Sequence, residues 1–87
     1  MKEIHKKTWP ELFEKVLEGK KNFDLRLADF EINEGDTLIL EEYEPKTKKY
    51  TGRKIKKKTG SIIKLNPVEM WDIDDIKKFG FYIIEMK

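Results

Sequence analysis

Three charged side chains of different chemistry follow Gly19 within a short stretch of the chain. Lys21, Asp24 and Arg26 supply an ammonium, a carboxylate and a guanidinium group. Such a row could bind a charged ligand, or it could form a solvated surface opposite a core. The pattern alone leaves both interpretations open, because polar rows opposite apolar rows are common on protein surfaces.

Residues 22–27 alternate between polar and apolar side chains. This predicts a β-strand, because successive side chains of a strand point to opposite faces. One face would carry Phe23, Leu25 and Leu27, and the other would carry Asn22, Asp24 and Arg26. We therefore expect Phe23 and Leu25 to be buried, with Lys21 and Arg26 bordering a groove beside the preceding helix.

That preceding helix is predicted from Pro10 to Glu18, after a short extended segment at residues 3–7. Thr8 can serve as N-cap while Glu11 completes a capping box, and Gly19 is a suitable C-terminal stop. The apolar stripe of the helix consists of Trp9, Leu12, Phe13, Val16 and Leu17. Helical spacing of this kind favours packing of the stripe, including Trp9, against a core.

Two further strands are expected in the middle of the chain. Residues 37–43 contain a continuous apolar triplet, which predicts a strand covered on both faces. Residues 50–63 predict one long or bent strand that pairs with it. Between these two strands the chain is expected to turn at residues 44–49.

The last third of the chain predicts a helix and a closing strand. Asn66 and Pro67 form a helix start, and Gly80 ends the helical pattern. The apolar run from Phe81 to Met86 predicts a buried strand. We assign the aromatic residues Phe13, Phe23, Phe81 and Tyr82 to the core.

Together these elements predict one domain over residues 1–87. Its expected fold class is α+β, mainly β: a small barrel of about five strands with two short helices. Charged residues make up 41% of the chain, and 19 basic and 17 acidic side chains nearly balance. The absence of cysteine excludes disulfides and thiolate sites, and a single histidine argues against a histidine-rich metal site. No cofactor or metal is expected.

The N-terminus has no long apolar run, and no segment is long enough to span a bilayer. A cytoplasmic monomer that does not contact membranes is therefore the default expectation.

A basic run extends from Lys46 to Lys58, with eight Lys or Arg residues and no acid. Lysines on a hairpin can protect an exposed sheet edge, or they can contact phosphates. Acidic residues before the run could pair with several of these lysines across the hairpin; they are Glu41, Glu42 and Glu44. Both interpretations remain open for Lys56 and Lys57.

The spacing Gly19-x-Lys21-x-x-Asp24-x-Arg26 resembles the signature of the ASCH domain, a small β-barrel of the PUA-like superfamily. Residues 8–13, 35–40 and 43–53 also resemble one branch, a group of short uncharacterised proteins described as RNA-binding ASCH-like. The resemblance is closest from Thr8 to Ile63. Asp24 is a departure, because the family more often has Glu there.

The resemblance implies a cleft for RNA or a modified nucleotide beside the signature helix and strand. Lys21 and Arg26 would then contact phosphate or a base edge. Asp24 would either hold these two cations in place or accept from an exocyclic amine of a base. Candidate stacking aromatics are Trp9, Tyr43 and Tyr50, and the lysine hairpin with Lys56 and Lys57 would assist.

An enzyme and a protein-interaction module are the competing classes. Related ASCH-like amidohydrolases of acetylated cytidine use a Lys, a Thr and a Glu. Lys21 matches their Lys, Asp24 stands where they have Thr, and no equivalent Glu can be placed. A ribonuclease would need an acid–base pair, for which His5 and Asp24 are the only candidates. The mild net charge of +2 keeps a regulatory or interaction module open.

The departure at Asp24 predicts no acetylcytidine amidase activity comparable to that of the related enzymes. Replacing the hydroxyl residue removes the nucleophile of the acyl-transfer route. Incubation of the purified protein with acetylated cytidine, followed by chromatography of the product, measures this directly. Substantial turnover that disappears in Lys21→Ala would contradict the prediction.

Overall fold

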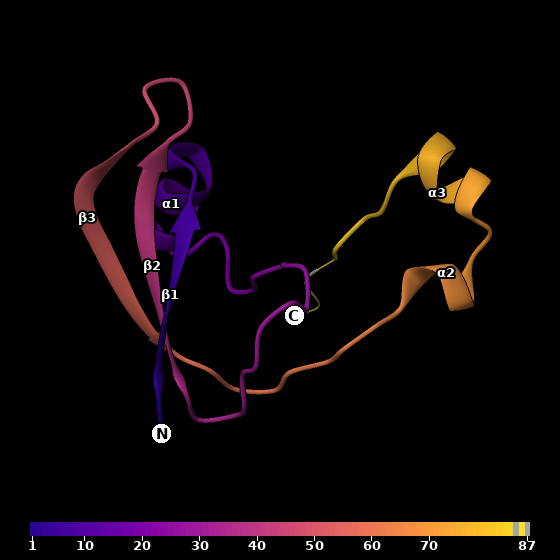
Figure 1. Cartoon of the computed structure of the whole chain (residues 1–87), viewed down its shortest axis with the longest axis horizontal. Helices are drawn as coiled ribbons and strands as arrows, with labels where there is room; N and C mark the ends of the chain where they lie inside the picture. Colours follow the sequence, from indigo (N-terminus) through magenta and orange to yellow (C-terminus); the bar gives the residue numbers. More distant parts are fainter. Residues whose placement is uncertain (85, 87) are drawn as a thin grey trace.

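The chain is built on a three-stranded mixed sheet (Figure 1). The computed structural model describes residues 1–84 and Met86. The strands are β1 (Glu3–Thr8), β2 (Thr37–Glu44) and β3 (Lys49–Lys58), and β2 lies in the middle. β1 runs parallel to β2, whereas β3 pairs with β2 in the antiparallel sense. The fold is therefore α+β with a sheet that remains open.

β2 is central because its apolar triplet must be covered on both faces. Leu38 and Leu40 pack with Val16 of the first helix, and Ile4, Ile32 and Ile55 lie against this cluster. Ile39 points to the opposite face and is also buried. Its neighbours across the ladder are His5 and Lys56, whose side chains can cover apolar surface. The strand predicted at residues 37–43 and its burial on both faces are confirmed.

Helix α1 (Pro10–Leu17) follows β1 directly and packs against β2. Phe13 and Val16 are its buried residues, and Gly19 takes a φ of 75° just beyond its end, as expected of a glycine stop. The predicted capping box is wrong, because the N-cap is Trp9 and no side chain caps the helix. Thr8 belongs to β1 instead. Trp9 is 58% exposed, so its predicted place in the core is also wrong.

Residues 22–27 do not form the predicted strand. They run through a long irregular connection between α1 and β2. Phe23, Leu25 and Leu27 are 41%, 71% and 81% exposed, so their predicted burial is wrong. The physical reason is that side-chain hydrogen bonds of Lys21 and Arg26 hold this stretch in place of a backbone ladder.

β3 ends earlier than the predicted strand, at Lys58, because Thr59 fastens the chain to the start of β2. The Thr59 amide donates to the Asp36 carbonyl at 2.8 Å, and the Gly35 amide donates to the Thr59 carbonyl at 3.0 Å. The Thr59 hydroxyl also lies 2.8 Å from the Asp36 carbonyl. The Asp36 carboxylate accepts from the amides of Asn33 and Lys2, which lowers its pKa. This clamp joins the ends of all three strands.

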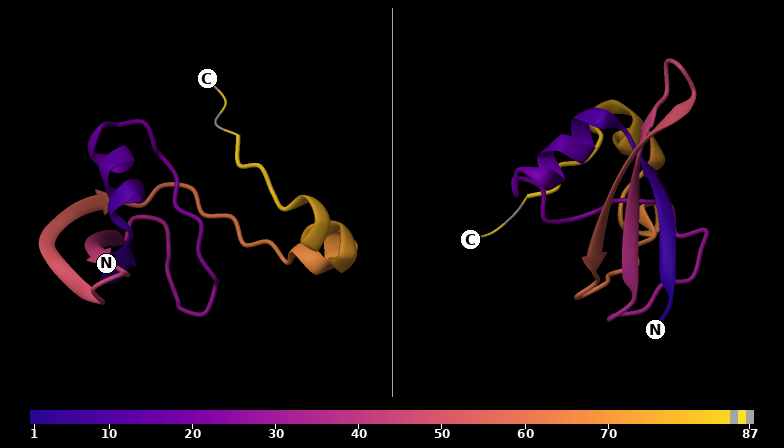
Figure 2. Two further views of the ribbon diagram at one scale, coloured as in Figure 1. Left: turned by 90° about the horizontal axis from the view of Figure 1, so that it is seen from above. Right: turned by 90° about the vertical axis from the view of Figure 1, so that its left-hand side faces the viewer.

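The last part of the chain lies away from the sheet, as both figures of the ribbon show (Figures 1 and 2). It contains two short helices, α2 (Pro67–Met70) and α3 (Ile73–Phe79), in place of the single predicted helix. Neither helix has a buried residue. Gly80 adopts a φ of 67° after α3.

The predicted closing strand is absent from residues 81–84, which have no regular structure; residue 85 lies outside the described part of the chain. Phe81 and Tyr82 are exposed, so their assignment to the core is wrong, whereas that of Phe13 is confirmed. A barrel of about five strands would need these missing strands to close the sheet. Among the described residues, no helix is long and apolar enough to cross a membrane.

Phe13 is 1% exposed and is the largest fully buried side chain described. We expect Phe13→Ala to lower the free energy of unfolding by about 3–5 kcal/mol, because it removes buried surface and leaves a cavity. Leu17→Ala, on the exposed side of the same helix, serves as control and should change it by less than about 0.5 kcal/mol. Urea denaturation followed by circular dichroism measures both values. If the two variants lost the same free energy of unfolding, the position of α1 on the sheet would be contradicted.

Candidate functional site

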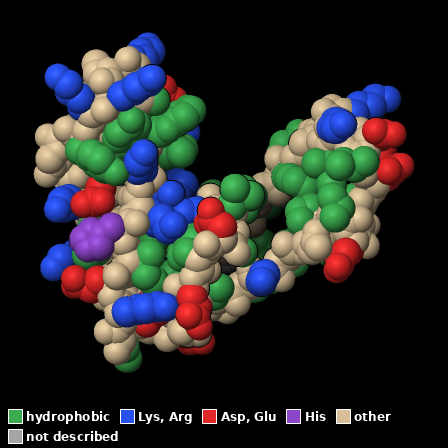
Figure 3. Space-filling model, viewed as in Figure 1, with side chains coloured by type: hydrophobic (Ala, Val, Ile, Leu, Met, Phe, Trp, Pro, Cys, Tyr) green, Lys and Arg blue, Asp and Glu red, His purple; other side chains and the backbone are tan. Residues whose placement is uncertain are grey.

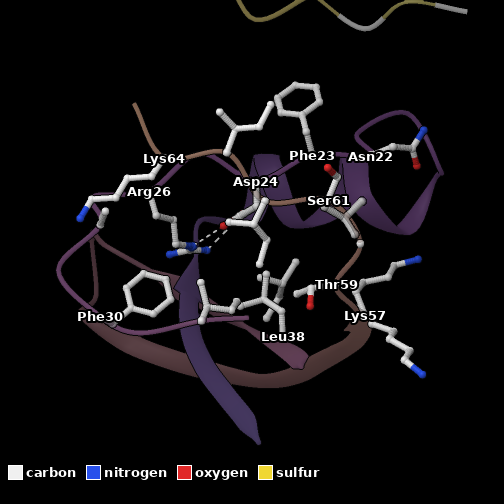
Figure 4. A pocket seen from close by; sticks show the side chains of 18 of the residues that line it. Asn22, Phe23, Asp24, Arg26, Phe30, Leu38, Lys57, Thr59, Ser61 and Lys64 are labelled. Carbon is white, nitrogen blue, oxygen red and sulfur yellow. Dashed lines mark hydrogen bonds and ion pairs between the residues drawn. The ribbon is translucent and has the colours of Figure 1, made fainter. Parts of the chain in front are cut away.

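A groove of about 600 Å³ opens on the side of the sheet that α1 partly covers (Figure 4). Leu38 and Leu40 of β2 form an apolar floor together with Val16 and Ile32. One wall is the connection from Lys21 to Ile32, and the other is the chain from Lys57 to Lys64. We call this feature the groove. It exists because α1 is too short to cover the whole face.

The structure brings Lys21, Asp24 and Arg26 together at the groove wall. The Arg26 Nε atom donates to Asp24 Oδ2 at 2.5 Å, and Arg26 Nη2 lies 3.4 Å from Asp24 Oδ1. Lys21 Nζ is 3.4 Å from the same Oδ1 and donates to the Phe23 carbonyl at 2.6 Å. Asp24 thus holds both cations as ion pairs, which is one of the two roles considered for it.

Arg26 has a second set of partners at the end of β1. Its Nη1 donates to the Lys7 carbonyl at 2.9 Å, and its Nη2 donates to the hydroxyl of the buried Thr8 at 3.1 Å. Arginine has five N–H donors, and these contacts together with Asp24 use most of them. Arg26 therefore fastens the connection to the sheet, and a bidentate contact with a base would require it to release partners.

Free positive charge in the groove comes from lysines of the opposite wall. Among the described residues, the side chains of Lys57, Lys58 and Lys64 form no hydrogen bond or ion pair, and all three residues line the groove. Lys57 and Lys64 are the two ends of this wall and lie far apart in the close view (Figure 4). Their ammonium groups remain available to an anionic ligand.

The other predicted site residues lie elsewhere. Lys56 faces away from the groove floor, on the sheet face of Ile39, with its Nζ atom 3.9 Å from Glu3. Tyr43 and Tyr50 face each other across the ladder, with ring centroids 5.0 Å apart in an edge-to-face arrangement. Trp9 does not line the groove either. The groove therefore contains Lys21, Asp24, Arg26 and Lys57 from the predicted set.

The acid–base pair considered for a ribonuclease is not assembled. His5 lies beside Ile39 in the ladder, and its Nδ1 atom is 3.4 Å from a carboxylate oxygen of Glu41. Asp24 lines the groove on the other face of the sheet. The sheet therefore separates the two side chains.

Sequence reasoning missed the aromatic rings at the groove. Phe23 and Phe30 both line it, and each lies under a lysine: Lys21 Nζ is 5.3 Å from the Phe23 ring and Lys6 Nζ is 3.6 Å from the Phe30 ring. The alternating pattern places Phe23 in a core instead. Phe30 carries no periodic signal, because it lies in an irregular segment.

A second cluster of charges joins α1, β2 and β3 beside the groove. Glu42 is only 4% exposed and accepts from Arg53 Nε at 2.9 Å, from Arg53 Nη2 at 2.8 Å and from the Thr51 hydroxyl at 2.5 Å. Arg53 Nη2 also donates to Glu14 at 2.5 Å. The bonds from Arg53, and then from Thr51, lower the pKa of Glu42 to about 2. Glu42 and Glu14 in turn raise the pKa of Arg53.

The arrangement defines a small α+β domain with an open, partly apolar groove and a charged wall. The chain belongs to the family described as domain of unknown function DUF3850, whose family model matches residues 4–72. This match covers the sheet, α1, the groove and α2. Neither the curated proteins nor the solved structures include a match to this chain.

The Glu42 cluster predicts a specific acid sensitivity. The pKa of Glu42 is lower in the folded chain than its ordinary value of 4.5, so its ion pair stabilises the fold above pH 4.5. This contribution is lost as the pH falls from about 4.5 towards 2. Asp36 acts in the same direction, so a comparison of variants is needed to isolate Glu42.

We expect Glu42→Gln to melt well below the wild type at pH 7 and to approach it at pH 2–3. Glu11→Gln, on the exposed surface of α1, is the control and should follow the wild-type profile. Melting temperatures by circular dichroism across this pH range test the prediction. If the difference in melting temperature between Glu42→Gln and the wild type stayed constant with pH, the prediction would be contradicted.

Proposed function

We propose that the protein binds RNA or a nucleotide in the groove. The observation that carries this proposal is the combination, around one open cavity, of an apolar floor, a fixed carboxylate and lysines without partners among the described residues. Ligand sites typically combine apolar walls with a few converging polar groups. The resemblance of the Gly19–Arg26 stretch to ASCH domains points to the same class of ligand.

The phosphate groups of the ligand would be bound by lysines of the wall that runs from Lys57 to Lys64. Lys57 and Lys64 lie at the two ends of this wall, and neither is engaged by another described residue. Lysine ammonium groups act as mobile point charges towards phosphates. The sugar–phosphate backbone of an RNA that crosses the groove can therefore contact both lysines.

The base would lie over the apolar floor, between the wall aromatics. Phe23 is 41% exposed and offers a ring at the groove for stacking. Asp24 is fixed by Lys21 and Arg26, and a carboxylate has about four acceptor sites, so it can accept one more hydrogen bond from an exocyclic amine. In this arrangement Arg26 positions Asp24 and the connection rather than reading the base itself.

A second contact surface lies near the hairpin on the other sheet face. Lys7 Nζ is 4.5 Å from the Tyr43 ring, and Tyr50 beside it is exposed. A longer RNA could stack on this pair after leaving the groove. The modest net charge of +2 favours weak to moderate binding rather than strong non-specific binding.

The test compares lysines on the two faces of the sheet. We expect the double variant Lys57→Gln, Lys64→Gln to weaken binding of a labelled single-stranded RNA. The slope of log affinity against log salt should also become shallower by about 0.7 for each phosphate that the variant no longer neutralises. Lys56→Gln, on the opposite face, is the matched control for Lys57→Gln alone, because each removes one charge, and it should change both quantities less. Fluorescence anisotropy at several salt concentrations measures affinity and slope.

Each variant must keep the melting temperature of the wild type for this comparison. If the wild-type protein binds neither RNA nor mononucleotides at low salt, where ionic contacts are strongest, the proposal fails. If Lys56→Gln weakens binding as much as Lys57→Gln, the site lies elsewhere on the basic hairpin.

A further inference from the structure

The C-terminal arm, residues 67–84, exposes an unusual amount of apolar surface. Figure 3 shows hydrophobic side chains gathered over it, with acidic side chains at their edge. Its large exposed apolar residues include Met70, Trp71, Ile73, Phe79, Phe81 and Ile84. Trp71 and Phe81 form a ring pair within the arm, with centroids 5.5 Å apart. Exposed apolar patches of this kind mark surfaces that bind another protein, a membrane or a ligand.

The groove is complementary to the arm in apolar character and in charge. Its floor is apolar and open, and its rim carries Lys57 and Lys64, which have no partner among the described residues. In the arm, residues 67–76 contain four acidic side chains and no basic one, and two lysines, Lys77 and Lys78, follow in the last turn of α3. Asp74 and Asp75 lie in the first turn of α3, beside the apolar residues of that helix. An arm that enters a groove would therefore bring aspartates close to lysines.

The path of the chain directs the arm away from its own groove. Residues 60–64 already line the groove as part of its wall. From there the chain runs outward to α2 and α3, which lie at a distance from the sheet, and the segment after α3 then turns back towards the rest of the molecule (Figures 1 and 2). The outward position of α2 and α3 presents the apolar side chains of these two helices to a second molecule.

We propose that two copies of the chain exchange their C-terminal arms. The arm of each copy packs its apolar side chains into the groove of the other, with Asp74 and Asp75 facing Lys57 and Lys64. Exchange of an identical element produces a closed two-fold dimer, in which both contacts are the same. Each copy supplies one arm of 18 residues and one groove, which is enough for the roughly 20–30 residues a side of a standard interface.

The arm and a nucleic acid would use the same groove, so they would exclude each other. The dimer itself requires no nucleic acid, because it follows from the apolar arm and the open groove. Its test therefore contains no RNA, and its outcome is independent of whether RNA binds.

The experiment reverses the charges on each side of the contact separately. Sedimentation velocity of the wild type at micromolar concentration should give a dimer. Lys57→Glu with Lys64→Glu makes the groove acidic, and Asp74→Lys with Asp75→Lys makes the arm basic. Each double variant should be monomeric, because like charges then meet at both contacts. The control Lys46→Glu with Lys48→Glu, in the hairpin turn, should remain dimeric.

Mixing the two monomeric variants supplies the decisive part of the experiment. A mixed dimer pairs an acidic groove with a basic arm and a wild-type groove with a wild-type arm, so both contacts are restored. Native mass spectrometry should show one copy of each variant in the dimer. Circular dichroism and melting curves establish that each variant is folded before mixing.

Three results would overturn the proposal. One is a monomeric wild type, which would mean that the arm stays free or closes on its own groove. Another is a dimer that persists in both charge-reversed variants, which would place the interface elsewhere. The third is a mixture that remains monomeric, because exchange between copies requires the complementary pair to associate.

Discussion

The structure depends on the burial of β2 within a sheet that is covered on one face by a single short helix. Leu38 and Leu40 need apolar neighbours, and α1 supplies one of them, Val16. The rest of that face is bounded by the irregular connection and by the chain after β3. The groove is therefore a direct result of a helix shorter than the sheet face on which it lies. In a chain of this size, a small core leaves such openings readily.

Polar side chains take the structural role that a further strand was expected to have. Arg26 reaches the Lys7 carbonyl and the Thr8 hydroxyl, while Asp24 neutralises it from within the connection. These contacts fix the path of residues 21–26 without a backbone ladder. The same side chains that suggested a ligand site therefore also hold the wall of that site, so substitution of Arg26 alone would alter both roles together.

Local patterns in the sequence were sufficient for α1, β2 and the glycine stops at Gly19 and Gly80, because each depends on residues close together in the chain. The alternation in residues 22–27 failed, because Lys21 and Arg26 hold this stretch through side-chain hydrogen bonds, with no backbone ladder. The pairing of β1 with β2 could not be predicted either. That parallel pairing of residues 3–8 has no local signal.

The site was predicted in part for the same reasons. Spacing alone put Lys21, Asp24 and Arg26 together, since they are close in sequence. Lys64 and Phe30 could be assigned to the groove only once the path of the irregular segments was known. Lys56 and Lys57 are adjacent and chemically identical, and only the register of β3 shows which one faces the floor.

The parallel pairing of β1 with β2 has a consequence for the order in which the protein folds. β2 and β3 are joined by the short turn at residues 45–48, so their pairing closes a small loop. β1 pairs with β2 across a much longer sequence separation: Lys2 and Asp36, which are hydrogen-bonded at the start of the two strands, are 34 positions apart. Closing a long loop costs more entropy and is slower. We therefore expect the β2–β3 hairpin to form first and β1 to join its free edge afterwards.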